Sequence, residues 1–220
     1  MSAHMRSLRA VHIAGCGRTK SSEGIMPSVS DESKTPDQLF REAWRSFCAL
    51  AGSTRAPEAT YQVWLAQALI DQFGRSRVAR EPNFRHKRFV TPLKADVPGS
   101  TVFLDAVVTR ADGIDMPHWV RREDPERGGI GLVGRLVAVS ESKVAASTTD
   151  GLQQGSVRQD FAKLSMLLDE ADSHDDVAAP LAYVCVLDNH QSRKYNFTTL
   201  EQTLGRYDER IALLRHTSRT

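Results

Sequence analysis

Three charged residues stand in apolar segments with the types and spacing that chemistry at a polar site requires. Glu141 and Lys143 are two positions apart, so in an extended strand their side chains point to the same face. Asp105 interrupts the apolar residues 102–108, where a charge costs free energy unless a partner compensates it. A metal ion shared by the Asp105 and Glu141 carboxylates would provide that compensation. The Lys143 ammonium would then stand beside a carboxylate-bound cation.

The segments that must position these residues have the composition of β-strands. Three are rich in β-branched or aromatic residues and are bounded by Pro, Gly or polar residues, and a fourth is an apolar run typical of a buried strand: residues 77–84, 101–109, 135–144 and 181–187. Alternation along the third segment places Val137 and Val139 on the face predicted for Glu141 and Lys143.

Two helices are predicted before the strands. Thr35 is a capping residue, Pro36 occupies the first helical position and Gln38 follows three residues after the cap, so a helix should run to about Leu50. A second helix should begin at Pro57 and end at Gly74. Its first turn contains Glu58, whose charge the helix dipole favours. Its apolar stripe consists of Tyr61, Leu65, Ala68, Leu69 and Phe73.

Two further helices are predicted after the third strand. The first follows Asp150 and shows an apolar rhythm at Leu152, Phe161, Leu164 and Leu168. The last has apolar residues at spacings of 4, 3, 4 and 3, namely Leu200, Leu204, Tyr207, Ile211 and Leu214.

The predicted element order is therefore α-α-β-β-β-α-β-α, an α/β fold with a central mixed four-stranded sheet flanked by helices. Residues 1–34 lack apolar periodicity and are expected to form a flexible leader. Residues 35–220 are expected to form a single domain. Within that domain, residues 111–134 combine Pro, Gly and paired charges and are expected to be an insertion.

Asp105 followed by Glu141-Ser142-Lys143 resembles the D…E-x-K signature of the PD-(D/E)XK, or restriction-endonuclease-like, nuclease superfamily. That fold places a helix before the strands, the Asp on the second strand, E-x-K on the third, then a helix and a fourth strand. The order predicted here is the same over a core of about residues 57–187. Leu104 stands where the family has proline, and 141 − 105 = 36 residues separate the carboxylates, which the insertion accommodates.

The resemblance implies a metal-dependent nuclease that hydrolyses phosphodiester bonds, in DNA rather than RNA, as a restriction or defence-type endonuclease does. Asp105, Glu141 and the backbone carbonyl of Ser142 would bind Mg²⁺ or Mn²⁺. Lys143 would orient the attacking water and neutralise developing charge. The alternative that stays open is a catalytically inactive nucleic-acid-binding or interaction module of the same fold.

Other polar residues are candidates for accessory roles. Glu81, which is equally compatible with a solvated strand charge, and the helix pair Gln159 and Lys163, four residues apart, would add polar groups to the site. Residues 75–94 are rich in Lys and Arg with only Glu81 against them, so they could run along a phosphate backbone. The expected contacts with nucleic acid are Arg80, Arg85, Lys87 and Arg88.

Composition excludes several other classes. The 220 residues are 40% hydrophobic and 25% charged, with a formal charge of +2, as in an ordinary globular protein. The three cysteines form no C-x-x-C pair, so neither a disulfide framework nor a cysteine zinc site is expected, and Cys48 and Cys185 should be buried. A cytoplasmic location without a membrane segment is expected, and a homodimer is compatible with the sequence.

The seven histidines form no H-E-x-x-H motif and no pair at helical spacing, which argues against a histidine zinc site. One arrangement stays open, in which His118, Asn189 and His190 would act together. Two tryptophans, Trp44 and Trp64, fall on helix stripes and are expected in the core.

Overall fold

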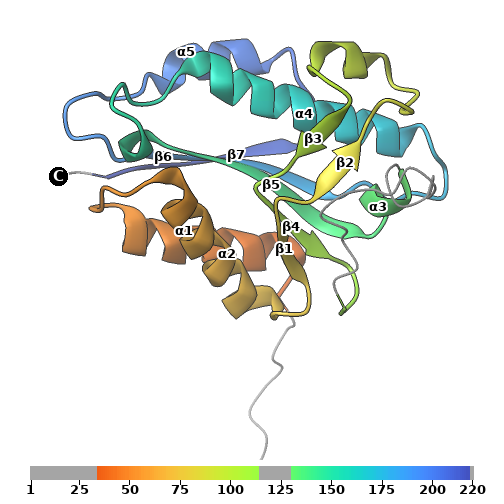
Figure 1. Ribbon diagram of the computed structural model, residues 1–220, viewed down its shortest axis with the longest axis horizontal. Coiled ribbons are helices and arrows are strands. Elements are labelled where there is room, and N and C mark those ends of the chain that lie inside the picture. Colours follow the sequence, from red (N-terminus) through yellow and green to blue (C-terminus); the bar gives the residue numbers. More distant parts are fainter. Residues whose placement is uncertain (1–33, 114–129, 219–220) are drawn as a thin grey trace, which may run out of the picture. The chain divides into compact units, whose positions relative to one another are not determined.

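The computed structural model describes residues 34–113 and 130–218, which belong to one compact unit, Lys34–Thr220. A five-stranded mixed sheet lies between helices in this unit (Figure 1). One face packs against α1 (Pro36–Ala51) and α2 (Glu58–Phe73), and the other against α4 (Gln154–Asp172). The predicted α/β class with a mixed, helix-flanked sheet is confirmed. Apart from Lys34, the predicted leader lies outside the described residues.

The first two helices begin and end where the sequence predicts. At the start of α1, Gln38 N donates to Thr35 Oγ1 over 3.3 Å, and Thr35 N donates to Gln38 Oε1 over 2.8 Å, which completes a capping box. Helix α2 ends at Gly74, whose φ of +88° suits a residue without a Cβ atom. The stripe predicted for α2, from Tyr61 to Phe73, is buried.

The main sheet has the strand order β1-β4-β5-β6-β7. Strands β1 (Val78–Arg80), β4 (Ala106–Thr109) and β5 (Leu136–Val144) are antiparallel, whereas β5, β6 (Leu181–Asp188) and β7 (Ile211–Thr217) are parallel. Helix α4 is the crossover between β5 and β6. The sheet thus turns from antiparallel to parallel at β5, the strand that carries Glu141 and Lys143.

Two of the predicted strands are each divided in the structure. Residues 77–84 become β1 and β2 (Asn83–Arg85), and residues 101–109 become β3 (Thr101–Phe103) and β4. The register is continuous, because Arg80 opposes Ala106 and, three residues further along each strand, Asn83 opposes Phe103. The bend falls at Glu81, whose φ is +50°. Beyond it, β2 and β3 form a separate two-stranded ribbon, with the turn η1 (Pro92–Asp96) between them.

The bulge between β4 and β5 changes one predicted orientation. Ala138 opposes Val108 and Leu136 opposes Thr109, so Val137 has no partner in the ladder. Val139 packs in the apolar cluster on the α4 side, but Val137 packs against the cluster on the side of α1 and α2. Val137 therefore does not share the face of Val139, because strict alternation ends at the bulge.

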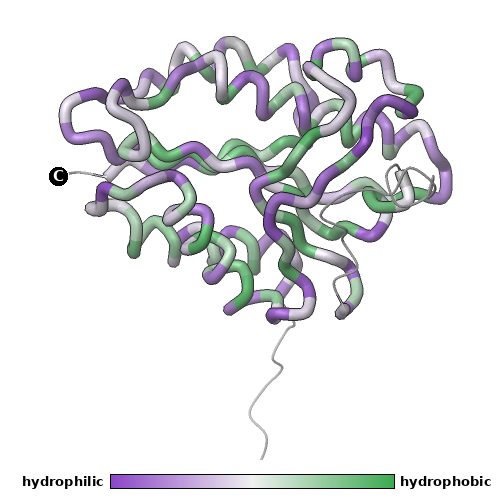
Figure 2. Tube along the Cα trace, in the orientation of Figure 1, coloured by the Kyte–Doolittle hydropathy of each residue, from purple (hydrophilic) through white to green (hydrophobic). Residues whose placement is uncertain are grey.

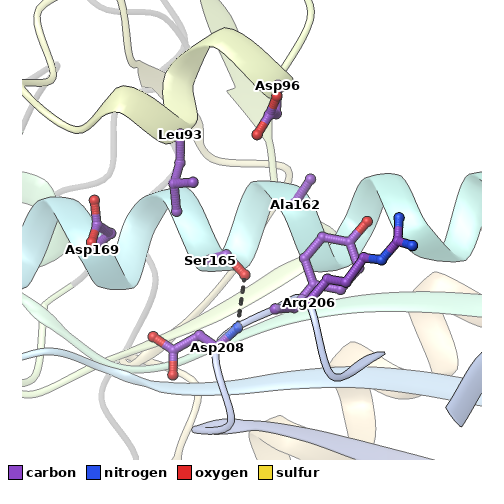
Figure 3. Close-up of a pocket in the computed structure, with 8 residues that line it drawn as sticks. Leu93, Asp96, Ala162, Ser165, Asp169, Arg206 and Asp208 are labelled. Atoms are coloured by element: carbon purple, nitrogen blue, oxygen red, sulfur yellow. Dashed lines mark hydrogen bonds between the residues drawn. The ribbon is translucent and has the colours of Figure 1, made fainter. Parts of the chain in front are cut away.

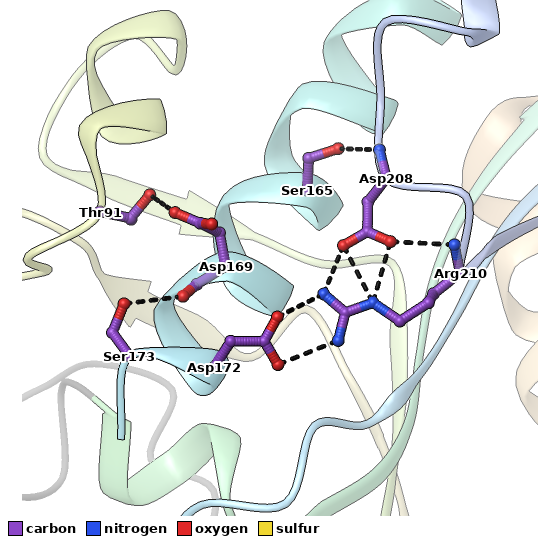
Figure 4. Close-up of polar contacts among 7 residues, drawn as sticks. All are labelled: Thr91, Ser165, Asp169, Asp172, Ser173, Asp208 and Arg210. Carbon is purple, nitrogen blue, oxygen red and sulfur yellow. Dashed lines mark hydrogen bonds and ion pairs between the residues drawn. The ribbon is translucent and has the colours of Figure 1, made fainter. Parts of the chain in front are cut away.

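The predicted last helix is wrong in its second half. Helix α5 (Phe197–Leu204) is present, but Ile211 and Leu214 belong to β7, a fifth strand that pairs with β6. Just before β7, the Arg210 guanidinium donates to the carboxylates of Asp208 and Asp172 (Figure 4). This contact anchors the chain beside the end of α4. The segment that follows then pairs with β6, and this strand pairing outweighs the helical spacing of its apolar side chains.

The core occupies both faces of the sheet. Figure 2 shows hydrophobic residues along the central strands and polar residues on the outer turns of the helices. Trp44 is buried, and Trp64 packs against the same cluster, as predicted. Cys48 and Cys185 are buried free thiols, and burial raises the pKa of Cys48 to about 12. None of the helices that the structure describes combines the length and apolar character needed to cross a membrane.

Only the ends of the predicted insertion are described. Residues 111–113 follow β4, and α3 (Ile130–Val133) precedes β5, with Leu132 and Val133 buried. Residues 114–129, which include His118, lie outside the described residues.

Candidate active site

Four charged side chains from β5 and α4 form an alternating cluster on one face of the sheet. Lys163 Nζ lies 2.9 Å from Glu141 Oε1 and 3.3 Å from Asp160 Oδ1. Lys143 Nζ lies 3.0 Å from Asp160 Oδ2. Oδ2 of Asp160 accepts no hydrogen bond of ordinary geometry, so its contact with Lys143 is an ion pair. The order Glu141, Lys163, Asp160, Lys143 alternates negative and positive charge.

Local structure explains how these four residues meet. Glu141 and Lys143 are two apart on β5 and both side chains meet α4, as alternation predicts. Asp160 and Lys163 are three apart on α4, so they lie on one side of the helix. Glu141 and Asp160 are 1% and 2% exposed, so each needs a cationic partner to remain ionised.

Asp105 lies at the bend before β4 and joins the site through Ser142. Its Oδ2 accepts hydrogen bonds from Ser142 N over 2.7 Å and from Ser142 Oγ over 2.9 Å. Its Oδ1 accepts from Gln62 Nε2 on α2 over 3.1 Å, and Arg80 Nη2 donates to Gln62 Oε1 over 2.9 Å. The relay from Arg80 through Gln62 orients the Asp105 carboxylate from the other face of the sheet.

Burial and mutual repulsion set the protonation of the carboxylates. The pKa of Glu141 is well above its ordinary value because the side chain is buried and because Asp160 and Asp105 are close, although Lys163 and Lys143 partly offset this. Burial also raises the pKa of Asp160, against the effect of the two lysines. Glu141 and Asp160 therefore take up a proton more readily than ordinary carboxylates do, and the two ammonium groups only partly oppose this.

The lysines are held in their charged form. Burial alone would lower the pKa of Lys143, but the carboxylates of Asp160, Asp105 and Glu141 outweigh burial and raise it. The pKa of Lys163 is likewise raised, because Glu141 and Asp160 outweigh its desolvation. Both residues present a permanent positive charge at neutral pH.

The donors that suit a divalent cation are carboxylate and carbonyl oxygens. Asp105, Glu141 and the Ser142 carbonyl are hard oxygen donors of the kind that suit such a cation, and the Ser142 carbonyl accepts a hydrogen bond from Lys143 Nζ over 3.3 Å. Within residues 34–113 and 130–218, no group of three or more His, Cys, Asp or Glu side chains is arranged to hold a metal ion. A metal site at this position would therefore need the Ser142 backbone carbonyl in addition to the carboxylates.

The predicted accessory residues separate into two groups. Lys163 lies in the cluster, but Gln159 is exposed and belongs to none of its contacts. Glu81 is opposite Asp105 in the continuous register, yet its side chain is 53% exposed and lies 3.5 Å from Arg80. Glu81 and Gln159 therefore remain outside the charged cluster.

Two residues of the site were missed by the sequence analysis. Asp160 falls on the buried stripe of α4, three residues after Val157 and four before Leu164, and a carboxylate at such a position signals a buried ion pair. Gln62 borders the buried stripe of α2, but its partner Asp105 is 43 residues away. Of these two residues, only Asp160 could have been identified from its neighbours in the sequence.

The predicted nucleic-acid contacts lie on β1 and beside the ribbon. Arg80 is held by Gln62, whereas Arg85 ends β2, and Lys87 and Arg88 are exposed in the turn that follows. Within the described part of the chain, the side chains of the last three make no hydrogen bond or ion pair. Their charges are therefore available to a ligand.

A cavity of about 480 Å³ lies beside Lys143. Glu58, in the first turn of α2, forms one wall, and residues 147–153 and Ser156 form the others. The predicted position of Glu58 in the first helical turn is confirmed, and the cavity adds a second environment for its carboxylate.

A different cavity, of about 270 Å³, lies on the side of α4 that faces η1 (Figure 3). Leu93 and Asp96 of η1 line it together with Asp169, Arg206 and other residues, and Asp208 N donates to Ser165 Oγ over 3.4 Å at its edge. Neither Glu141 nor Lys143 contributes to its wall.

Asn189 and His190 have structural roles in the described part of the chain. Asn189 accepts a hydrogen bond from Ala146 N and donates to the carbonyls of Ala51 and Thr54. His190 Nδ1 accepts from Ser192 N and Arg193 N. His118 lies outside the described residues, so the structure gives no distances for the predicted arrangement of His118, Asn189 and His190.

Comparisons of the chain with protein-family models, with curated proteins and with solved structures find no match.

Proposed function

We propose that this protein is a metal-dependent nuclease that hydrolyses phosphodiester bonds in nucleic acid, preferentially DNA, and that it resembles the PD-(D/E)XK superfamily. One observation carries the proposal: Glu141 and Lys143 meet α4 on one face of β5, while Asp105 is bonded to the intervening residue, Ser142. The succession of β5, α4 and β6 also supports the proposal, whereas Asp105 lies at the bend before β4 and not within a strand.

The residues have distinct roles in this proposal. Asp105, Glu141 and the Ser142 carbonyl would hold Mg²⁺ or Mn²⁺, which when bound lowers the pKa of a water molecule and stabilises charge on phosphoryl oxygens. Lys143 is charged and partly exposed, so its ammonium can donate to the attacking water and to the phosphate. Asp160 holds Lys143 in place, as a positioning residue.

Lys163 has a role of its own in this proposal, before the cation binds. Its ammonium donates a hydrogen bond to Glu141 Oε1, an oxygen of the carboxylate that would bind the metal. Lys163 would move away from Glu141 when the cation arrives. Its side chain is 26% exposed, so it can turn to a substrate phosphate without leaving the helix surface.

Cleavage assays with the purified full chain test the proposal. Plasmid, single-stranded DNA and RNA are incubated with Mg²⁺, with and without EDTA, and Glu141→Gln is compared with Glu209→Gln, which changes an exposed glutamate before β7. We expect Mg²⁺-dependent cleavage by the wild type and by Glu209→Gln, and none by Glu141→Gln. Equal cleavage by both variants would exclude this site.

One observation favours a second function, binding of nucleic acid without cleavage. Both oxygens of Asp105 already accept hydrogen bonds, from Ser142 and from Gln62, so the carboxylate has partners without a metal. Salt-dependent binding with no cleavage in Mg²⁺ or Mn²⁺ would support this function.

A further inference from the structure

The two faces of the β2–β3 ribbon differ sharply. On the inner face, Phe84 opposes Val102, and both are buried in the core cluster on the α4 side. On the outer face, Phe103 opposes Asn83 and Arg85 opposes Thr101. Partners across an antiparallel pair share a face, so Phe103 and Arg85 are diagonal neighbours there.

Phe103 is the unusual residue on this outer face. It is 50% exposed, although a phenylalanine loses free energy when its ring stays in water. It forms none of the aromatic or cation–π contacts found within the described part of the chain. The ring thus presents apolar surface without a partner, next to a cationic side chain.

Basic residues lie on one side of Phe103, towards the turn that follows β2. Arg85 lies diagonally across the ribbon, and Lys87 and Arg88 follow in the exposed turn. On the other side of Phe103, Asp105 follows two residues along the chain, and Glu81 lies opposite Asp105 at the bend. An exposed aromatic ring beside the cationic Arg85 is complementary to a strand that carries both bases and phosphates.

The ribbon also leads directly to the candidate active site. Phe103 precedes Asp105 by two residues, or about 7 Å at roughly 3.3 Å per residue of strand. Figure 1 shows β3 running from the ribbon into the region where β4 meets β5. A base placed on Phe103 would lie within about one nucleotide of a phosphate at Asp105.

We infer that the outer face of the ribbon binds a single-stranded segment of nucleic acid, with an unpaired base stacked on Phe103 and a phosphate held by Arg85. Within a duplex both faces of a base are covered by its neighbours, so the ring can stack only on a base that is unpaired or displaced. The choice of nucleic acid as ligand rests on the proposed function, but binding to this face does not depend on cleavage.

Fluorescence anisotropy in EDTA tests the inference without catalysis. The probes are a fluorescein-labelled oligothymidylate and a labelled hairpin duplex, at fixed salt. The variants are Phe103→Ala, Phe103→Trp and, as a matched control, Val63→Ala, which removes a 51% exposed apolar side chain from α2. Thermal melting of each variant verifies that it is folded.

We expect Phe103→Ala to bind the single strand about 5- to 100-fold more weakly, the effect of losing one stacked base, with less than about a 2-fold change for the duplex. Phe103→Trp and Val63→Ala should bind as the wild type does. Arg85→Gln should reduce the slope of log affinity against log salt by about 0.7, the value for one phosphate contact on a single strand.

Three results would overturn the inference: Phe103→Ala binds the single strand like the wild type, it loses single-strand and duplex binding equally, or the wild type binds neither probe. The proposed nuclease is judged separately by its Mg²⁺-dependent cleavage. Cleavage with unaltered binding by Phe103→Ala rejects only the ribbon, and Phe103-dependent binding without cleavage rejects only the nuclease.

Discussion

Lys163 Nζ and Glu141 Oε1 are 2.9 Å apart, although α4 and β5 contribute them from positions 22 residues apart in the chain. The ammonium thus stands where the proposed mechanism requires a metal ion to meet the same carboxylate. The Lys163 ammonium and a divalent cation would therefore compete for Glu141 Oε1.

Lys163→Met should therefore raise the affinity for Mg²⁺ by about tenfold, or about 1.4 kcal/mol, because it removes the cation that occupies Glu141. Isothermal titration calorimetry without nucleic acid measures this directly. Lys194→Met, which changes an exposed lysine outside the cluster, is the matched control, and its affinity should not change. Unchanged or weaker affinity in Lys163→Met would refute the competition.

Lys143→Ala should lower cleavage by about 10²-fold, the usual effect of removing one preorganised electrostatic donor. It should also destabilise the fold, since Asp160 is 2% exposed and would lose one of its two ion pairs. The double variant Lys143→Met/Asp160→Asn separates the two effects. Its melting temperature should recover relative to Lys143→Met, whereas cleavage should not, and full recovery of cleavage would show that Lys143 is only structural.

Gln62→Leu should weaken Mg²⁺ binding by about 10- to 100-fold, as is usual when a residue that orients a metal ligand is lost. Gln62 contacts Asp105 but supplies no ligand itself, so the effect must arise from orientation. Calorimetry and the Mg²⁺ dependence of cleavage both report it. Gln67→Leu, which changes an exposed position of α2 bonded only to Asp71, is the control; equal behaviour of the two variants would contradict the relay.

Acid should destabilise the fold through His86. The ring is 2% exposed, neither nitrogen has a hydrogen-bond partner, and burial together with Lys94 lowers the pKa of His86. Below its unfolded pKa of about 6.5 the unfolded chain binds more protons than the folded chain, so stability falls as pH falls towards the lower folded value.

Denaturant unfolding between about pH 7.5 and 5 measures this loss. It should be smaller in His86→Gln than in the wild type. The exposed His216→Gln variant should behave as the wild type does. An identical pH dependence in all three proteins would show that His86 does not contribute.

Local signals in the sequence predicted much of the fold. The cap at Thr35, the stop at Gly74 and the alternation around Glu141 depend only on neighbouring residues, and each appears in the structure. The strand β7 was missed because Leu204, Tyr207, Ile211 and Leu214 happen to repeat at helical spacing. Pairing with β6, a non-local interaction, decides that segment.

The site was predicted to the extent that it lies on one strand. Glu141 and Lys143 share a face because of a period of two, which the sequence displays. Asp160 and Gln62 depend on how α4 and α2 pack on the sheet, so no local pattern identified their partners. The charge balance of the cluster could only follow from the folded arrangement.

The position of β7 at the edge of the sheet protects the strand behind it from self-association. Seven of the eight residues of β6 are buried, and the strand is almost wholly apolar. If β7 did not cover its edge, such a strand would be a template for cross-β aggregation. The outer strand ends in exposed Arg215 and His216, and charge of this kind at an edge discourages further pairing. The last strand therefore serves colloidal stability as well as the fold.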